Sequence, residues 1–431
     1  MTARRLTAVD AQMYWMSASI PNDQFLLYAF DGSPEHLGRA LDEVWTRAQR
    51  RPEFGLRIAD SGVWTYPVWE PRAVDDEQFV VHELTDATWQ GCLDAVARLT
   101  DSQLDARQIT WRLHVFPGLD GVPGAAEAAV TVLQLSHALG DGVRASALAA
   151  YLFGRDAGIP TVCAEPAAAT MLPVLACRAA RAHRRLERDV RAGLTPPQAV
   201  SVPALRSNSR PAGTRHLRTV VCGRDQFGAA TVTAAALAAV SAALAGQLRE
   251  LGDDPARLGA EVPMAKAGNR QAFNHFGNVG VGLYPGLDRS RRVDFIAADL
   301  RQRRRRAAHP AAHAEAAAFA AVPASLLRWG VGQFDPEVRS ATVTGNTVVS
   351  SVNRGAKDLR FGAAPVALTA GFPALSPMMA VTHGVHGIGD TVVVSVHAAD
   401  SGIGDIDTYA ARLARELRGS ADEVPVGRGP K

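Results

Sequence analysis

One short segment combines a histidine, an aspartate and two glycines at a spacing that could support acid–base chemistry. It reads Ser136-His137-Ala138-Leu139-Gly140-Asp141-Gly142 and directly follows an apolar run. Histidine suits general-base catalysis because its ordinary pKa lies near neutrality. At the end of a strand its side chain stands on a rigid backbone, and the glycines leave room for a ligand chain to approach. The pattern predicts that His137 is a general base for acyl transfer to a hydroxyl.

The aspartate and the serine of this segment each allow more than one role. Asp141 could orient the imidazole of His137, pair with an arginine to hold the loop, or only cap the helix that follows. His137 itself could be a half-buried histidine whose hydrogen bonds are satisfied within the protein and which has no catalytic role. Ser136 does not form a Ser–His dyad by adjacency, because neighbouring residues of a strand point to opposite faces. Direct attack by the acceptor, with His137 as the base, is the simpler mechanism.

The elements that must position this segment are a strand before it and a helix after it. Apolar alternation predicts a strand over residues 128–135, and helical spacing predicts a helix over residues 143–153. Similar patterns predict strands over residues 24–30, 63–68, 79–84, 110–116, 216–222, 280–283, 347–352, 378–383 and 391–397. They predict helices over residues 34–45, 86–101, 172–192, 234–251 and 406–417. This irregular alternation predicts an α/β fold of the α+β kind with mixed sheets.

A change of composition divides the chain into two halves of similar size. Residues 158–213 are rich in alanine, proline and arginine, which predicts a linker that contains one helix. The linker would separate an N-terminal subdomain, residues 1–157, from a C-terminal subdomain, residues 214–431. The tail from Ser420 onward is predicted to be disordered.

Composition narrows the class of protein. The 431 residues are 47% hydrophobic and 21% charged, which is typical of a soluble globular protein with sizeable cores. The net charge of +3 is too small to indicate a nucleic-acid partner. The four cysteines show no CxxC spacing and the N-terminus has no apolar signal core, which predicts reduced thiols and a cytoplasmic location. No stretch approaches 18 uncharged apolar residues, so no membrane span is expected.

Several segments, in order along the chain, together resemble the bacterial wax ester synthase/diacylglycerol acyltransferase family. In its HHxxxDG signature the second histidine, the aspartate and the glycine match His137, Asp141 and Gly142. The other matching segments are Leu6-Thr7-Ala8-Val9-Asp10-Ala11, Leu104-Asp105, Trp111, Glu261-Val262-Pro263-Met264, Asn274-His275-Phe276-Gly277-Asn278, Asn346-Thr347-Val348-Val349-Ser350-Ser351-Val352, Asp400 and Asp405-Ile406-Asp407. That family belongs to the superfamily of CoA-dependent acyltransferases and peptide-synthetase condensation domains.

The resemblance implies a fold, a reaction and a set of site residues. The fold would be two chloramphenicol-acetyltransferase-like subdomains in a V, with a central substrate channel. His137 would deprotonate the acceptor hydroxyl midway along the channel, while Asp141 and Gly142 would shape its loop. Residues expected to contact substrate are Ser136, Gly140, Asn278 and Ser350. The donor would be acyl-CoA or an acyl group on the phosphopantetheine of an acyl carrier protein, with no permanently bound cofactor and no metal.

Departures from the family pattern keep the acceptor and two alternatives open. Ser136 stands where the family has its first histidine, and Thr233-Ala234 stands where it has Asn-Asp. These changes favour a specialised acceptor, such as a secondary metabolite, over a long-chain lipid. One alternative is a free-standing condensation-type enzyme that forms an ester or amide from carrier-bound substrates. The other is a relative that binds ligand or partner without catalysis.

Two arginine-rich segments could face either a charged partner or solvent. One is the run Arg301, Arg303, Arg304, Arg305 and Arg306, and the other is the linker helix. Attraction to CoA phosphates, a carrier protein or an anionic membrane is one interpretation, and a solvated helix face is the favoured one. Nucleic acid is not expected, because no aromatic residues interleave with the charges. Peripheral contact with a membrane stays open.

The remaining histidines carry weaker predictions. His309 and His313 could share a helix face, but Pro310 argues against a regular helix there and no third metal ligand is evident. One of three late histidines could line the channel, namely His383, His386 or His397.

Overall fold

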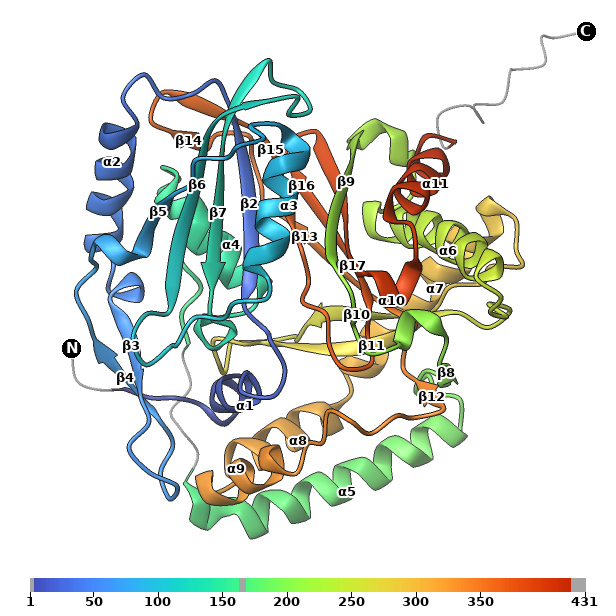
Figure 1. Cartoon of the computed structure of the whole chain (residues 1–431). Helices are drawn as coiled ribbons and strands as arrows, with labels where there is room; N and C mark the ends of the chain where they lie inside the picture. The colour runs from blue at the N-terminus through green and yellow to red at the C-terminus, as the bar shows by residue number, and fades with distance from the viewer. Residues whose placement is uncertain (1–3, 163–167, 420–431) are drawn as a thin grey trace, which may run out of the picture.

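Two lobes, each built on a six-stranded mixed sheet, make up the computed structural model within residues 4–162 and 168–419, the part of the chain that is described (Figure 1). This confirms the predicted α/β class with mixed sheets. Cys163 and the tail from Ser420, for which disorder is predicted, lie outside the described residues.

The first lobe surrounds a sheet with the strand order β14-β15-β2-β7-β6-β5. These strands are β14 (Arg360–Phe361), β15 (Ala364–Gly371), β2 (Gln24–Asp31), β7 (Glu127–Leu135), β6 (Trp111–Asp120) and β5 (Phe79–Val81). One face is covered by α2 (Leu37–Gln49) and α4 (Gly142–Leu152), and the other by α3 (Trp89–Leu99). A small sheet of β1 (Arg4–Arg5), β4 (Val68–Pro71) and β3 (Leu56–Ala59) lies beside α1 (Ala8–Met16).

The second lobe has a sheet with the strand order β11-β10-β13-β16-β17-β9. Its strands are β11 (Phe276–Gly282), β10 (Gly259–Ala265), β13 (Thr347–Asn353), β16 (Val381–Ile388), β17 (Thr391–Ala399) and β9 (Arg215–Gly223). The helices on its outer face are α6 (Val232–Glu250), α7 (Arg289–Ala307) and α11 (Ile406–Arg418). Helix α6 is long and apolar enough to cross a membrane, but 72% of its apolar window is buried in this lobe, so it is a core helix.

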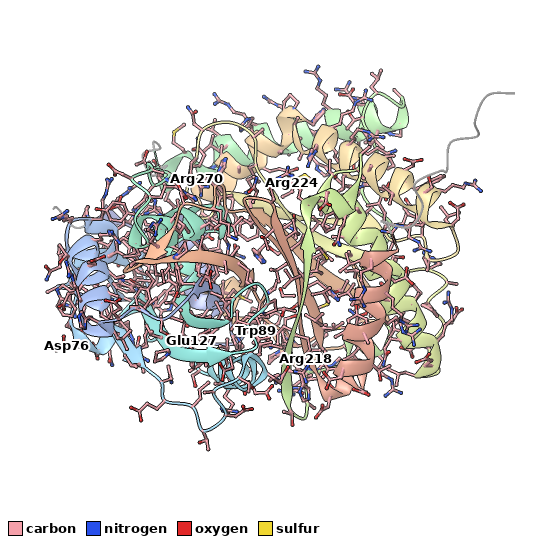
Figure 2. All side chains as sticks on the ribbon, turned by 90° about the horizontal axis from the view of Figure 1, so that it is seen from above. Asp76, Trp89, Glu127, Arg218, Arg224 and Arg270 are labelled. Atoms are coloured by element: carbon pink, nitrogen blue, oxygen red, sulfur yellow. The ribbon has the colours of Figure 1, made fainter. Side chains whose placement is uncertain are left out.

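Helix α3 joins the lobes by packing on β9. Trp89 Nε1 donates to Thr219 Oγ1 at 3.2 Å, and Arg218 lies 3.6 Å from Asp94. Figure 2 places the labelled Trp89 and Arg218 at this junction. The buried residues of α3, Leu217 and Val393 share one apolar cluster, so the lobes form a continuous core there.

A layer of helices lies below both lobes in Figure 1. It contains α5 (Leu172–Arg191), α8 (Pro310–Ala320) and α9 (Ala324–Gly332), with short elements β8 (Val202–Pro203), β12 (Thr342–Val343) and α10 (Asp400–Ile403) nearby. The arginine run on α7 holds the linker that follows α5. Arg303 donates to the carbonyl of Pro197 at 2.6 Å and Arg306 to that of Pro196 at 3.0 Å. The prediction of a wholly solvated face is therefore wrong for these two side chains.

The strand before the histidine segment is buried on both faces. Residues of β7 alternate between the cluster under α2 and α4 and the cluster under α3. This accounts for its nearly continuous apolar sequence. Pairing of Gln24 with Leu135 on one side and of Trp111 with Leu135 on the other fixes the end of β7. A slip of one residue would turn the whole strand over, so the position of His137 is fixed by core packing.

The structure departs from the sequence-based elements in several places, and helices α1, α8 and α9 were not among the predicted elements. Of residues 63–68 only Val68 lies in a strand, as the first residue of β4: Val63 and Trp64 are 52% and 81% exposed in the connection from β3 to β4, where no strand pairs with them. Strands β10 and β15 were not predicted. Strand β15 pairs with β2, so residues 360–371 return to the first sheet, and the simple division at residue 214 does not describe them.

Candidate active site

His137 begins a single turn of 3₁₀-helix, residues His137–Leu139, between β7 and α4. Its ring is stacked on Phe276 of β11, with centroids 5.7 Å apart. The Nδ1 atom lies 2.9 Å from Oδ1 of Asn274, which precedes β11 in the chain. Among the described residues none forms a hydrogen bond with Nε2. The first lobe therefore supplies the imidazole, and the second lobe supplies the groups that hold it.

Asn274 is fixed by a buried aspartate. Its Nδ2 donates to Oδ1 of Asp10 at 3.0 Å and to the carbonyl of His137 at 2.8 Å. Both amide hydrogens are thereby used, so Oδ1 must face the imidazole. Asp10, 2% exposed, also accepts the backbone N–H groups of Phe273 and Asn274 and the hydroxyl of Thr7. The result is a chain of contacts from Asp10 through Asn274 to His137.

This chain determines which imidazole nitrogen carries the proton. Since Oδ1 of Asn274 can only accept, Nδ1 of His137 must donate, and Nε2 is left with a lone pair. Burial lowers the pKa of His137 below its usual 6.5, while the Asn274 contact partly offsets that effect. The imidazole is therefore neutral at pH 7, with Nε2 in the state that a general base requires.

Asp141 holds the loop between His137 and α4. Its Oδ1 accepts the N–H of Arg144 at 3.0 Å, which caps α4, and its Oδ2 accepts the N–H of His275 at 2.8 Å. Arg270, labelled in Figure 2, donates to Oδ2 at 2.8 Å. Burial alone would raise the pKa of Asp141, but these donors lower it below its ordinary value. Asp141 thus binds the loop 266–275 of the second lobe, and it makes no hydrogen bond to the imidazole of His137.

Gly140 and Arg144 make the turn compact. Gly140 has φ of +155°, and a Cβ there would lie 2.6 Å from Cδ of Arg144. Arg144 is 1% exposed; its Nε donates to the carbonyl of Leu139 at 3.0 Å, and its guanidinium lies 3.9 Å from the ring centroid of Phe273. Burial lowers the pKa of Arg144 to about 10, so it remains charged at neutral pH. A side chain at position 140 would displace this buried arginine.

The predicted substrate contacts lie on two sides of His137. Ser136 is 5% exposed, and its hydroxyl makes no hydrogen bond with any described residue. Asn278 lies on the same face of β11 as Phe276, because strand residues two apart share a face. Ser350 likewise shares a face of β13 with Val352, whose Cγ2 lies 3.3 Å from the Cβ position of Gly142. Their contact with substrate stays a prediction.

A cavity of about 200 Å³ lies between the lobes and is separate from the site at His137. It is lined by Asp23 and Phe25 of the first lobe and by His397 and Phe372, among others, and His137 is not among its lining residues. Asp23 accepts from Leu104 N and Gln134 Nε2, both at 2.8 Å, and burial raises its pKa to about 6. His397 uses Nδ1 for the carbonyl of Pro373 and has no partner at Nε2. Of the three late histidines, His397 lines this cavity.

No group of three His, Cys, Asp or Glu side chains in residues 4–162 and 168–419 is placed to hold a metal ion. Helix α8 begins at Pro310, where proline is tolerated because the first turn needs no N–H donor. Helix α7 ends at Ala307 and His309 lies before the first turn of α8, so no regular helix runs through His309 and His313, as Pro310 predicts. His309 caps this helix and lies 3.1 Å from Asp189.

Sequence reasoning missed the residues that hold His137 and its loop, which come from both lobes. Asp10 and Asn274 were marked only as members of segments that resemble a family, with no role given. Phe276 was likewise marked only as part of such a segment. Arg270 carried no signal, since it is a lone arginine in a polar loop. Their importance follows from contacts between residues 137 and 129 positions apart in the chain.

The fold is similar to several solved structures over almost the whole chain. The wax ester synthase/diacylglycerol acyltransferase from Marinobacter aquaeolei VT8 aligns with 96% of this chain and 98% of its own, at 17% identity and a TM-score of 0.64. A starter condensation domain of rhizomide synthetase RzmA aligns with 98% of this chain and 95% of its own, at 15% identity and a TM-score of 0.58. The condensation domain of the Monacolin K polyketide synthase MokA aligns with 98% of this chain and 98% of its own, at 14% identity and a TM-score of 0.56.

No protein-family model matches the chain, and no curated protein matches it either. At identities of 14–17% the likeness concerns the fold. The chain therefore has the two-lobed fold of wax ester synthases and condensation domains, as the resemblance of its motifs implied.

Proposed function

We propose that this protein is an acyltransferase that moves an acyl group from a thioester to an acceptor hydroxyl, with His137 as general base. The observation that carries the proposal is the state of the imidazole. Nδ1 is held by Asn274, burial keeps the ring neutral, and Nε2 has no hydrogen-bond partner in the described part of the chain. A fold shared with a wax ester synthase and with condensation domains supports the same class of reaction.

The reaction would proceed by direct attack. The acceptor O–H gives its proton to Nε2 of His137 while its oxygen bonds to the thioester carbonyl carbon. The tetrahedral intermediate then expels the thiolate sulfur, which takes the proton back from Nε2. In between, the imidazolium is stabilised by the hydrogen bond from Nδ1–H to Oδ1 of Asn274, because hydrogen bonds strengthen when the donor is charged.

The neighbouring residues would bind rather than react. We assign Asp141 and Gly142 to the geometry of the loop, since Asp141 is fully engaged with Arg270 and two backbone N–H groups. The unpartnered hydroxyl of Ser136 is available to donate to the carbonyl oxygen as negative charge develops there. Gly140, Asn278 and Ser350 complete the proposed substrate contacts.

The donor class is proposed from the structural neighbours. One RzmA starter condensation domain was solved in complex with C8-CoA. A CoA thioester, or an acyl group on the phosphopantetheine of a carrier protein, is therefore the donor we propose here. A specialised alcohol is the proposed acceptor, and a condensation-type reaction that forms an amide is the second candidate, favoured by the likeness to the RzmA and MokA domains.

A mass-spectrometric screen tests the proposal. The purified protein is incubated with C8-CoA, with longer acyl-CoA thioesters and with acylated carrier protein, each against a panel of alcohols and amines. An ester or amide product is expected, with a rate 10²–10⁴-fold lower in His137→Ala. The matched control is His36→Ala, an exposed histidine on the outside of the first lobe, which should leave the rate unchanged. Undiminished turnover in His137→Ala would remove the base assignment, and no product from any donor would favour a binding protein.

A further inference from the structure

Exposed apolar side chains gather on one side of the molecule. Trp64 at the tip of the β3–β4 connection is 81% exposed, and Trp329 on α9 is 63% exposed. Leu326 of α9, at 50%, and Met171 and Val174 at the start of α5, at 44% and 47%, are also exposed. In Figure 1 the β3–β4 tip, α9 and the start of α5 lie together at the lower edge of the molecule. We call this side, with the outer surface of α5, the basal face.

Hydrogen bonds fix the two segments that carry the exposed tryptophans. Arg328, beside Trp329, donates to Asp60 Oδ1 at 3.0 Å, which ties α9 to the β3–β4 connection. Tyr66, on the other side of Trp64, donates its hydroxyl to the carbonyl of Val322 at 2.7 Å, just before α9. The backbone that carries both indole rings is thus held in place while the rings project. Large apolar side chains that are exposed together on one side of a protein mark an interaction surface.

The outer surface of α5 adds unpaired positive charge. Arg178, Arg181, Arg184 and Arg188 are exposed, and their side chains form no hydrogen bond or ion pair with any described residue. With Arg185, whose closest acid is Asp189 at 3.8 Å, the positions 178, 181, 185 and 188 follow the 3–4–3 spacing of one helix face. The charges form a stripe that runs along the basal face from its apolar end.

Acidic groups of the same layer already have partners. Glu315 lies 3.1 Å from His183, and Glu337 pairs with Arg210. Asp189 is bonded to His309 at 3.1 Å, and Asp60 is bonded to Arg328. Helix α5 itself carries six exposed arginines and only two acids, Glu187 and Asp189, so the basal face has an excess of positive charge beside exposed tryptophan.

We propose that the basal face docks on an anionic membrane surface. Trp64 and Trp329 would enter the interface between headgroups and acyl chains, where indole rings are favoured, and the arginine stripe of α5 would lie against lipid phosphates. Each arginine close to an anionic leaflet raises the affinity about fivefold. An acidic protein partner would use the arginines, but it would not require two indole rings to project beyond them. This surface is independent of whether His137 catalyses acyl transfer.

Vesicle co-sedimentation of the full chain tests the surface directly. The probes are vesicles of phosphatidylcholine alone and of phosphatidylcholine with 30% phosphatidylglycerol. We expect binding to the anionic vesicles that weakens with salt, and little binding to the neutral ones. Replacing Arg178, Arg181, Arg184 and Arg188 by serine should reduce the affinity about 100-fold or more, and Trp64→Ala with Trp329→Ala at least tenfold.

A matched control removes the same charge elsewhere. Arg39, Arg50, Arg98 and Arg224 are exposed outside the basal face, and their side chains also form no hydrogen bond or ion pair with a described residue. Their replacement by serine should change vesicle affinity less than threefold. Circular dichroism establishes that each variant is folded. The proposal is overturned if the wild type stays in the supernatant with anionic vesicles at low salt, or if the control variant loses as much affinity as the α5 variant.

Discussion

Replacing Asn274 by alanine is the sharpest test of how the second lobe controls the histidine of the first. The side chain of Asn274 makes three hydrogen bonds: with His137 Nδ1, with the His137 carbonyl and with Asp10. One of them involves a carboxylate, so their loss should destabilise the protein by about 3–5 kcal/mol. Asp10 would remain buried with fewer donors, which adds to this cost.

The effect on rate is separate from the effect on stability. In the transition state the Nδ1–H donor is cationic, and a hydrogen bond to a charged group contributes about 1.5–3 kcal/mol, or roughly 10–150-fold in kcat. Alanine also leaves Nδ1 without an acceptor, so the tautomer with a free Nε2 is no longer enforced. We therefore expect kcat to fall about 10–150-fold in the folded variant.

The pH profile distinguishes this role from a merely structural one. The pKa of His137 is below 6.5, so the rate should fall only when the pH drops below that lowered value. The Asn274 contact raises this pKa, so its removal should move the acid limb to still lower pH while the plateau falls. The assay is release of CoA thiol from the donor that gives most product, measured between pH 4.5 and 8.

A second buried asparagine provides the control. Asn208 is 3% exposed against 1% for Asn274, and its Nδ2 donates to the carbonyls of Gly345 and Met378, both at 3.1 Å. Asn208→Ala should cost a similar free energy of unfolding and leave kcat and the pH profile of the folded fraction unchanged. The reasoning fails if Asn274→Ala retains the wild-type kcat and acid limb, or if Asn208→Ala moves that limb equally.

Three further substitutions test the packing around the site. Gly140→Ala should cost about 1–3 kcal/mol, because the new Cβ meets buried Arg144; Gly38→Ala in α2, with open space at its Cβ, should be neutral or stabilising by thermal denaturation. Arg270→Ala leaves Asp141 buried and short of its counter-charge, which should cost about 3 kcal/mol in urea unfolding, whereas Arg107→Ala, whose pair with Asp105 is exposed, should leave the free energy of unfolding nearly unchanged. Asp23 has a pKa of about 6 in the folded protein and 3.8 as its ordinary value, so the folded state holds the proton more tightly. Asp23 therefore stabilises the folded state by up to about 3 kcal/mol below pH 3.8, and this stabilisation is lost as the pH rises through 6. Asp23→Asn should abolish that part of the pH dependence of the free energy of unfolding. An unchanged pH profile in the variant would contradict the assignment.

Local patterns were sufficient for the elements next to the histidine. Apolar runs and helical spacing predicted β2, β7 and β17 and the helices α4, α6 and α11 to within a few residues. Most of these elements bury the majority of their side chains, and α11 buries one regular stripe of Ile406, Tyr409, Leu413 and Leu417, so their apolar patterns are strong. The end of β7 and the start of α4 therefore placed His137 at a strand-to-helix junction.

Elements whose structure depends on distant pairing escaped prediction. Strand β10 carries Pro263, which weakens a strand pattern, and it is stabilised by pairing with β11 and β13. Strand β15 joins a sheet whose other long strands come from residues before 136. Val63 and Trp64 look like part of a strand because they are apolar, but their exposure arises from the position of the β3–β4 connection on the molecular surface.

The sequence alone determined the chemistry that is available: a histidine, an aspartate and two glycines at the end of an apolar strand, and enough matching segments to imply the two-lobed fold. Only the tertiary structure decided the state of that histidine. Asn274 and Asp10 fix its tautomer, burial lowers its pKa, and Arg270 holds its loop through Asp141. Hydrogen bonds between residues more than a hundred positions apart leave no periodic pattern in the sequence, so folding had to bring these groups together before their roles could be assigned.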